Sequence, residues 1–289
     1  MTDFPPPPIL APEDHWALLS DDAPYGDLTT ESLGIGGGNG SIRFAARQAM
    51  TVAGLEDAAA LLSLAGVSVT THARSGDRLA SGATLLEGEG PASALHRGWK
   101  VSQTFLEIWS GVATAARALT DAAQAVRADA VVACTRKNVP GTKAMAAAAV
   151  RAGGAVMHRL GLSETLLVFP EHRAFLPNSD LASLAQRLKS VAPEKKCIIE
   201  VLSVAEGIDA AKAGFDVIQT EKFSPQEVAE LAQAISSITP KPVLAAAGGI
   251  TPENAGNYVQ SGADVLVSSW PYTARPADIA VSLGPPPHE

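Results

Sequence analysis

Two short basic runs are the part of this sequence best suited to chemistry. Thr135, Arg136 and Lys137 follow one apolar stretch, and His158 and Arg159 follow another. Arginine presents a planar fork of N–H donors and lysine a mobile point charge, a combination that suits a phosphate or a carboxylate. We therefore predict an anion site built around these five residues.

The distribution of charge also points to a small, highly anionic ligand. The net charge of the chain is −8, which argues against nucleic acid as a partner. Residues 136–173 nevertheless form a basic segment, with Arg136, Lys137, Lys143, Arg151, Arg159 and Arg173 set against only Glu164 and Glu171. A solvated helix face is the alternative explanation, and it fits Arg151 and Arg173 best.

Two acidic residues stand out because apolar runs surround or precede them. Glu200 lies inside the apolar stretch 197–202, and Glu221 follows the stretch 216–220. A buried carboxylate is costly unless an arginine, a lysine or a metal ion pairs with it. Glu200 is therefore either a functional carboxylate or half of a structural salt bridge, and both readings stay open. Glu200 and Glu221 are also the candidate oxygen ligands for Mg²⁺.

A glycine pair marks a second place where an anion could bind. Gly248 and Gly249 follow an apolar run and precede a helix that should begin near Thr251. Glycines at such a point let backbone N–H groups approach a phosphate at the positive end of a helix. Ser268 and Ser269 end the next apolar run, so two adjacent loops could share one phosphate site.

The elements that must position these residues alternate from about residue 129 onward. We expect strands at 131–134, 155–157, 166–169, 197–202, 216–220, 242–247 and 264–269. We expect helices between them at 142–152, 180–191, 204–213, 224–238 and 251–261. Repeated βα units predict a parallel sheet, and six or more of them favour an α/β barrel over an open doubly wound sheet, which remains the alternative. The carboxyl ends of the strands are where the polar residues above fall.

The first 110 residues have a different pattern. Residues 41–47 alternate, with Ile42, Phe44 and Ala46 on one face, as in a half-buried strand. Strands at 67–74 and 84–89 and a helix at 55–64 complete a small α+β domain. A long helix near 92–109 leads out of it, with Leu95, Trp99, Ser102, Leu106 and Trp109 spaced as one buried stripe. We assign residues 1–110 to this domain and 111–270 to the barrel. The tail, 271–289, either packs back on the first domain or stays loose.

Composition restricts the class of protein. With 46 % apolar and 18 % charged residues, the chain can fill one or two globular cores. No apolar run reaches the ~18 residues of a membrane span, and the beginning, MTDFPPPPIL, lacks the features of a secretory signal. We therefore expect a cytoplasmic protein, with Cys134 and Cys197 as reduced core residues rather than a disulfide or a metal site.

Several motifs, in order along nearly the whole chain, resemble those of the quinolinate phosphoribosyltransferases of the NadC type. They are Asp27 to Thr30, Ser110 to Thr114, Cys134 to Lys137, Pro140 with Gly141, His158 to Ser163, and Gly248 to Ile250. The resemblance implies an N-terminal α/β domain followed by an open, TIM-like barrel, in a homodimer or a higher oligomer. It implies the transfer of a phosphoribosyl group from phosphoribosyl pyrophosphate, with Mg²⁺, to quinolinate, giving nicotinate mononucleotide, carbon dioxide and pyrophosphate.

The resemblance also implies roles for individual residues. The catalytic candidates are Glu200, Lys137 and Glu221. The candidates for binding substrate are Lys100, Thr135, Arg136, Lys137, His158 and Arg159. The candidates for binding the 5′-phosphate are Ala247, Gly248, Gly249, Ser268 and Ser269.

Some positions depart from the family pattern, and they concern the acceptor base more than the phosphate loops. Lys100 stands where the family has arginine, Phe169 where it has a lysine that contacts substrate anions, and Leu202 where it has a second carboxylate. These departures resemble the ModD branch, the paralogue linked with molybdenum transport genes. Three readings stay open: a quinolinate enzyme, a ModD-type transferase with another aromatic carboxylate, and a non-catalytic phosphate- or nucleotide-binding regulator.

Overall fold

The structure is a computed structural model that describes residues 6–176 and 179–285. The chain divides into two compact units. The N-terminal unit comprises Met1–Arg117, Val139–Gly154 and Pro271–Glu289, and the barrel unit comprises Ala118–Asn138 and Ala155–Trp270. Residues 111–117 and 139–154, which the sequence pattern assigned to the barrel, thus belong to the N-terminal unit.

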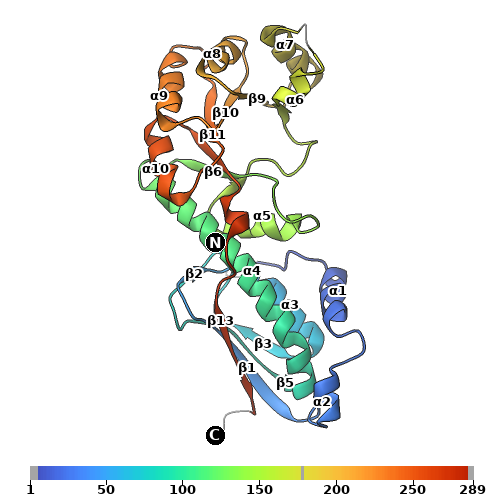
Figure 1. Cartoon of the computed structure of the whole chain (residues 1–289). Helices are drawn as coiled ribbons and strands as arrows, with labels where there is room; N and C mark the ends of the chain where they lie inside the picture. Colours follow the sequence, from blue (N-terminus) through green and yellow to red (C-terminus); the bar gives the residue numbers. More distant parts are fainter. Residues whose placement is uncertain (1–5, 177–178, 286–289) are drawn as a thin grey trace. The chain divides into compact units, whose positions relative to one another are not determined.

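The N-terminal unit is an antiparallel sheet with helices (Figure 1). Its elements are α1 (Pro12–Asp22), α2 (Leu28–Ser32), β1 (Asn39–Ala46), β2 (Met50–Thr51), α3 (Leu55–Ala65), β3 (Ser68–Thr71), β4 (Arg78–Leu79), β5 (Thr84–Pro91), most of α4 (Ala92–Gln124), α5 (Lys143–Ala152) and β13 (Ile279–Gly284). Its main sheet has the order β13-β1-β5-β3, and β2 pairs with β4. The tail therefore packs on this unit, because β13 pairs with β1 from Ser41 to Ala46.

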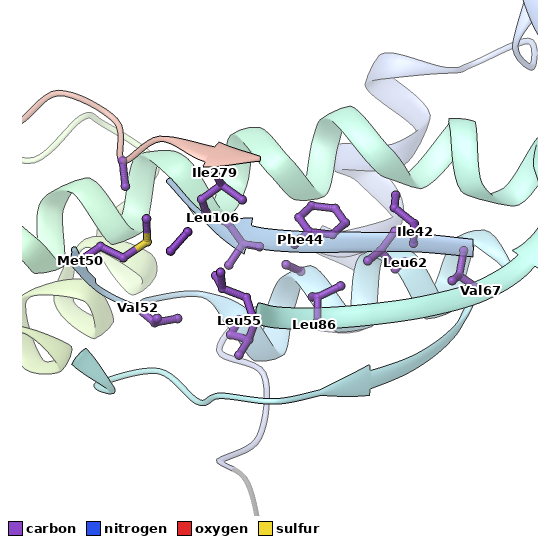
Figure 2. Close-up of a cluster of buried hydrophobic side chains, with 14 of the residues drawn as sticks. Ile42, Phe44, Met50, Val52, Leu55, Leu62, Val67, Leu86, Leu106 and Ile279 are labelled. Atoms are coloured by element: carbon purple, nitrogen blue, oxygen red, sulfur yellow. The ribbon is translucent and has the colours of Figure 1, made fainter. Parts of the chain in front are cut away.

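Alternation in β1 builds the core of this unit. Ile42, Phe44 and Ala46 are buried while their neighbours are half-buried or exposed, as the sequence predicted. Figure 2 shows Ile42 and Phe44 in one apolar cluster with Leu62 of α3 and Leu106 of α4. Ala46 belongs to the same cluster. The tail contributes Ile279 to the same cluster, which anchors β13.

The long helix α4 begins where the sequence predicts but continues to Gln124. Its second half is rich in alanine, the best helix former, so no residue ends the helix near Trp109. Gly111 is needed within it, because a Cβ there would lie 2.4 Å from the carbonyl oxygen of Arg275. The helix α5 packs within the same unit, where Gly153 lies against the backbone of Ala113. These contacts explain why residues 139–154 belong to the N-terminal unit.

The barrel unit is a parallel α/β structure whose strands lie close to their predicted positions. Its elements are β6 (Val131–Cys134), β7 (Val156–Met157), β8 (Leu166–Val168), α6 (Pro170–Arg173), α7 (Leu181–Val191), β9 (Cys197–Val201), α8 (Val204–Lys212), β10 (Val217–Glu221), α9 (Pro225–Ala234), β11 (Val243–Ala247), α10 (Pro252–Gln260) and β12 (Val265–Ser268), followed by the 3-10 turn Trp270–Thr273 that leads out of the unit. The sheet order is β7-β6-β12-β11-β10-β9-β8, so β7 and β8, consecutive in the chain, form its two edges. The barrel is therefore open, and the expected fold class is confirmed.

Helices cover the outer face of this curled sheet. α8 packs against β9 and β10, α7 against β9, and α10 against β12 (Figure 1). The inner face carries small side chains, among them Ala245, Ala247 and Val267, which pack together with Val217 and Val265. Small residues leave space inside the barrel for the longer polar side chains described below. Within the described residues, no helix is long and apolar enough to cross a membrane.

Candidate active site

The two basic runs lie together at the carboxyl end of neighbouring strands. Thr135 follows β6 and donates its backbone N–H to Ser268 O of β12 (2.9 Å), and its Oγ1 accepts the backbone N–H of Lys137 (3.3 Å). His158 follows β7 and donates its backbone N–H to Cys134 O (2.8 Å). Strand pairing thus brings these loops to one edge of the barrel.

Arg159 is a buried cation without a carboxylate partner. Its side chain is 6 % exposed, and no ion pair to it exists in the part of the chain that the structure describes. Its guanidinium carbon lies 5.8 Å from the centre of the Phe169 ring. Burial and the neighbouring Arg136 charge lower the pKa of Arg159, and neither arginine has an acidic partner among the described residues. Such a pair is arranged for an anion that comes from outside the protein.

Glu200 lies opposite Gln219 in the parallel register of β9 and β10. Gln219 Nε2 donates to Glu200 Oε2 at 2.8 Å, and no salt bridge to Glu200 occurs among the described residues. The structural salt bridge considered from the sequence is therefore not formed. Burial raises the pKa of Glu200, and the charges of Glu221 and Glu171 add to this, whereas the Gln219 hydrogen bond and Lys137 act against it.

His158 is half-buried and close to Gln219 across the inside of the barrel. In a flat sheet β7 and β10 would be about 19 Å apart, at about 4.8 Å per strand, so this proximity requires the sheet to curl. Burial and the Arg159 charge lower the pKa of His158, and the contacts with Gln219 and Glu164 only partly oppose them. The imidazole is thus biased toward its neutral form.

The loops after β10 and β11 contact each other through strained backbone. Lys222 has a φ of 58°, Gly248 has a φ of 90°, and Lys222 donates its backbone N–H to Ala247 O at 2.8 Å. A Cβ on Gly248 would lie 2.6 Å from Lys222 Cγ, so only glycine fits there. Glu221, whose side chain is 31 % exposed, lies 3.5 Å from Lys222 Nζ.

The second glycine opens onto free space beside a helix N-terminus. Gly249 has a φ of 74°, and no atom would lie within 4 Å of a Cβ placed there. Asn254 in the first turn of α10 donates to Gly249 O at 2.9 Å, which fixes the loop. Ser268 is committed to structure, since its Oγ donates to Ile250 O (2.8 Å) and accepts from Trp270 N (3.0 Å). Ser269 makes no side-chain hydrogen bond within the described residues and is the serine left for a ligand.

Lys100 lies apart from this set in the sequence and in the domain structure. It belongs to α4 in the N-terminal unit, where its Nζ lies 3.1 Å from Gln103 Oε1 and 4.5 Å from the centre of the Trp99 ring. Every other candidate residue belongs to the barrel unit.

The sequence reasoning missed two polar features. Gln219 is buried within β10. The signal in the sequence is an amide in the middle of an apolar run, three residues after Asp216. Such an amide indicates a polar partner, because buried amides need hydrogen bonds. Arg173, for which a solvated helix face was the alternative explanation, forms an ion pair with Glu206, and Glu206 also accepts the backbone N–H of Leu202 (2.7 Å).

The two cysteines are buried free thiols, and burial raises the pKa of Cys134 to about 12. A thiol with so high a pKa is protonated at neutral pH and is a poor nucleophile. Cys134 therefore serves as packing beneath the basic loop rather than as a reactive group.

Comparison with known proteins places the chain in a family. The profile of the quinolinate phosphoribosyl transferase C-terminal domain matches residues 112–282, and that of the N-terminal domain matches residues 27–110. The chain is 46 % identical over 241 residues to the pyrophosphorylase named ModD of Rhodobacter capsulatus, covering 83 % of this chain and 92 % of the relative. A ModD of Escherichia coli is 40 % identical over 270 residues, covering 93 % and 95 %.

A solved structure, NadC from Streptococcus pyogenes, superposes with a TM-score of 0.85 at 27 % identity, covering 95 % of this chain and 98 % of that one. The chain is thus more similar in sequence to these ModD proteins than to this NadC. The two domain profiles together cover most of the chain. The chain belongs to the quinolinate phosphoribosyltransferase family, which consists of pentosyltransferase-type enzymes.

Proposed function

We propose that this protein transfers the 5-phosphoribosyl group of phosphoribosyl pyrophosphate to the ring nitrogen of an aromatic carboxylate such as quinolinate. The observation that carries the proposal is Arg159, a buried residue near Arg136 that has no carboxylate partner among the described residues. A buried cation of this kind gains its missing interactions when an anionic substrate binds. Both substrates of the proposed reaction are anions.

The donor would bind across the loops that follow β11 and β12. The 5′-phosphate would take the open space beside Gly249, at the N-terminal end of α10, with Ala247, Gly248 and Ser269 around it. Lys137 and Lys222 are both exposed at this edge and would meet the pyrophosphate. Arg136 and Arg159 would bind the acceptor carboxylate or the pyrophosphate.

The chemical step is a displacement at the anomeric carbon of the ribose. The bond from this carbon to the pyrophosphate oxygen breaks, and the lone pair of the acceptor ring nitrogen forms the new bond. With quinolinate, loss of one carboxylate as carbon dioxide completes the reaction. Glu200 would lie beside the positive charge that develops on the ribose, where a fixed carboxylate stabilises the transition state.

Mg²⁺ is expected with the donor, and the residues present fit it. No group of three or more metal-binding side chains occurs among the described residues, so the protein offers no closed cage. Gln219 is the register partner of Glu200, and Glu221 lies two residues further along the same strand, so both carboxylates are on the same face of neighbouring strands. One or two carboxylates plus substrate phosphates is a common way to bind Mg²⁺. Glu200 and Glu221 would hold the ion, and its chemical contribution when bound is to neutralise charge on the pyrophosphate.

A ModD-type acceptor is the second candidate, and the loop after β8 favours it. Phe169 stacks on His172 with ring centres 5.8 Å apart and also lies against Arg159, so this wall is aromatic. Leu202, at the end of β9, is 59 % exposed and adds apolar surface. An acceptor with one carboxylate and a neutral aromatic edge would fit such a wall better than a dicarboxylate.

The decisive experiment follows consumption of phosphoribosyl pyrophosphate and release of pyrophosphate. The arms are quinolinate, nicotinate and other pyridine monocarboxylates, pyrimidine carboxylates, and no acceptor. Turnover in at least one acceptor arm and none without acceptor is expected. Activity with quinolinate alone would rule out the second candidate. Tight pyrophosphate binding with no turnover in any arm would contradict the proposed activity and would indicate a binding protein.

We further propose a cytoplasmic homodimer, as the family resemblance implies. Tyr25 and Leu28, 97 % and 79 % exposed near α2, are large apolar side chains that a second subunit could cover. Light scattering coupled to size-exclusion chromatography tests the oligomeric state directly, and a monomer at micromolar concentration would contradict the proposed dimer.

A further inference from the structure

Gln219 is a buried amide that the proposed chemistry does not use. Its side chain is 4 % exposed, and in register it faces Glu200 on β9 and Ala245 on β11. Its Nε2 donates to Glu200 Oε2 at 2.8 Å. Its Oε1 is inaccessible to solvent and accepts no hydrogen bond within the described residues. A buried amide oxygen without a donor is costly, so a nearby donor is to be expected.

His158 is the neighbouring side chain that has such a donor. Its imidazole interacts with the Gln219 side chain. One N–H of Nε2 is committed to Glu200, and the buried Oε1 has no partner among the described residues, so Oε1 is the atom that an imidazole N–H would satisfy. The opposite orientation of the amide would set its oxygen against the Glu200 carboxylate, where two acceptors would repel each other. The amide therefore has one orientation that satisfies both neighbours, with the carboxylate on one side and the imidazole N–H on the other.

We infer that Gln219 is a positioning residue that joins Glu200 to His158, holding the carboxylate with its Nε2 and the imidazole N–H with its Oε1. One ring nitrogen of His158 then carries the proton permanently. The other nitrogen is left as an acceptor toward the site, suited to a hydroxyl group of the pentose rather than to a phosphate. The identity of that substrate rests on the proposed function, but the connection among the three side chains does not.

Two substitutions separate this role from a purely structural one. Gln219→Leu removes both the donor and the acceptor. Gln219→Glu keeps an acceptor beside His158, adds a negative charge and removes the donor to Glu200. Thr220→Val is the matched control, since Thr220 is buried on the same strand but faces the other side of the sheet. Arg159 and Glu164 are the other charged groups that act on His158, and all three variants leave them unchanged.

The first test is ¹⁵N NMR titration of His158 in the full chain, with its signals assigned by their absence in His158→Asn. We expect one dominant tautomer in the parent protein, a lower His158 pKa and mixed tautomers in Gln219→Leu, and a higher pKa in Gln219→Glu. Thr220→Val should match the parent. Shifts of the same direction in both Gln219 variants, or no shift in either, would overturn the inference. If Gln219→Leu does not fold, the near-isosteric Gln219→Glu still gives the result.

The second test is steady-state kinetics with the best acceptor. Gln219→Leu should lower kcat by at least about tenfold, since Glu200 loses its fixed position, and Thr220→Val should stay within about twofold. An unchanged kcat in Gln219→Leu would refute the positioning of Glu200. A parent protein inactive with every acceptor would contradict the proposed function alone, because the NMR result would still decide the role of Gln219.

Discussion

Arg159→Met separates stability from function and tests the central feature of the site. Methionine keeps the apolar part of the side chain but removes its charge. Arg159 is 6 % exposed and has no carboxylate partner within the described part of the chain. Removal of an unpaired buried charge does not leave an opposite charge unpaired, so the usual penalty for breaking a buried pair is absent. The contact with Phe169 is lost, at a cost of about 0.5–1 kcal/mol. We therefore expect the free energy of unfolding without ligand to change by no more than about 1 kcal/mol.

Binding should respond much more strongly. A hydrogen bond between a charged donor and an anion contributes about 1.5–3 kcal/mol, which is about a 10- to 150-fold change in Kd. At a pyrophosphate concentration 100 times the Kd of the parent protein, ligand stabilises the folded state by about 2.7 kcal/mol. With a Kd weakened about 100-fold, the same concentration gives only about 0.4 kcal/mol. At about 2–4 °C per kcal/mol, the ligand-induced shift in Tm should fall from about 5–10 °C to about 1 °C.

Arg173→Met is the matched control for this experiment. Arg173 belongs to the same unit and is partly buried, but it is paired with Glu206, so its loss leaves that carboxylate without its partner. It should lower Tm without ligand and leave the pyrophosphate-induced shift unchanged. Calorimetric titration with pyrophosphate and thermal unfolding with and without it give both quantities. If Arg159→Met lowered the ligand-free Tm as much as Arg173→Met did, or kept the full ligand-induced shift, the reasoning would be refuted.

Three further predictions follow from the same site. Glu200→Gln should lower kcat by about 10²–10³ with folding intact, and unchanged turnover would remove Glu200 from the chemistry. Gly248→Ala should destabilise the protein more than Gly214→Ala in urea unfolding, because both have φ near 90° but only Gly248 would place a Cβ 2.6 Å from Lys222 Cγ; equal losses would show that the clash is relieved. The pKa of His158 is lowered in the folded state, so the unfolded chain binds a proton at this residue more readily. The contribution of His158 to the free energy of unfolding is therefore fully present above its ordinary pKa of 6.5. It is lost as the pH falls from 6.5 through the lower pKa of the folded state. His158→Asn should flatten that acid dependence of the free energy of unfolding, and an identical dependence in parent and variant would count against it.

The strands of the barrel could be predicted because their signals are local. Each one is a short apolar run with helix signals on both sides, and a parallel sheet buried on both faces requires such runs. The division into units could not be predicted in the same way. It depends on the continuation of α4 past Trp109. It also depends on the packing of Gly153 against Ala113, which is a contact between segments far apart in the sequence. The strand β13 in the tail could not be predicted for the same reason, because it is recognisable only through its pairing with β1.

The grouping of the basic residues at one end of the barrel was predictable for a related reason, whereas the hydrogen-bond partners of the candidate site residues were not. Because the carboxyl ends of parallel strands meet at one edge, residues that follow strands, such as Arg136 and Arg159, can be placed together from sequence. Whether Glu200 pairs with a cation or with Gln219 depends on strand register. Whether Ser268 faces a ligand or ties Ile250 to Trp270 depends on the path of two loops. Neither property leaves a local signal.

Of the three departures that the sequence resemblance indicates, Lys100 belongs to the N-terminal unit, whereas Phe169 and Leu202 fall on one side of the barrel. Phe169 follows β8, at one edge of the open sheet, and Leu202 follows β9 beside it. The glycine loop and Ser269 follow β11 and β12, nearer the middle of the sheet. Each βα loop of a barrel can change without disturbing the others, because the strands beneath carry the fold. Within the barrel, a change of acceptor therefore needs only the loops after β8 and β9 to change, while the loops proposed for the donor stay as they are. Arg136 and Arg159 are proposed to serve either substrate, because the acceptor carboxylate and the donor pyrophosphate are both anions. A change of acceptor therefore does not require these two arginines to change.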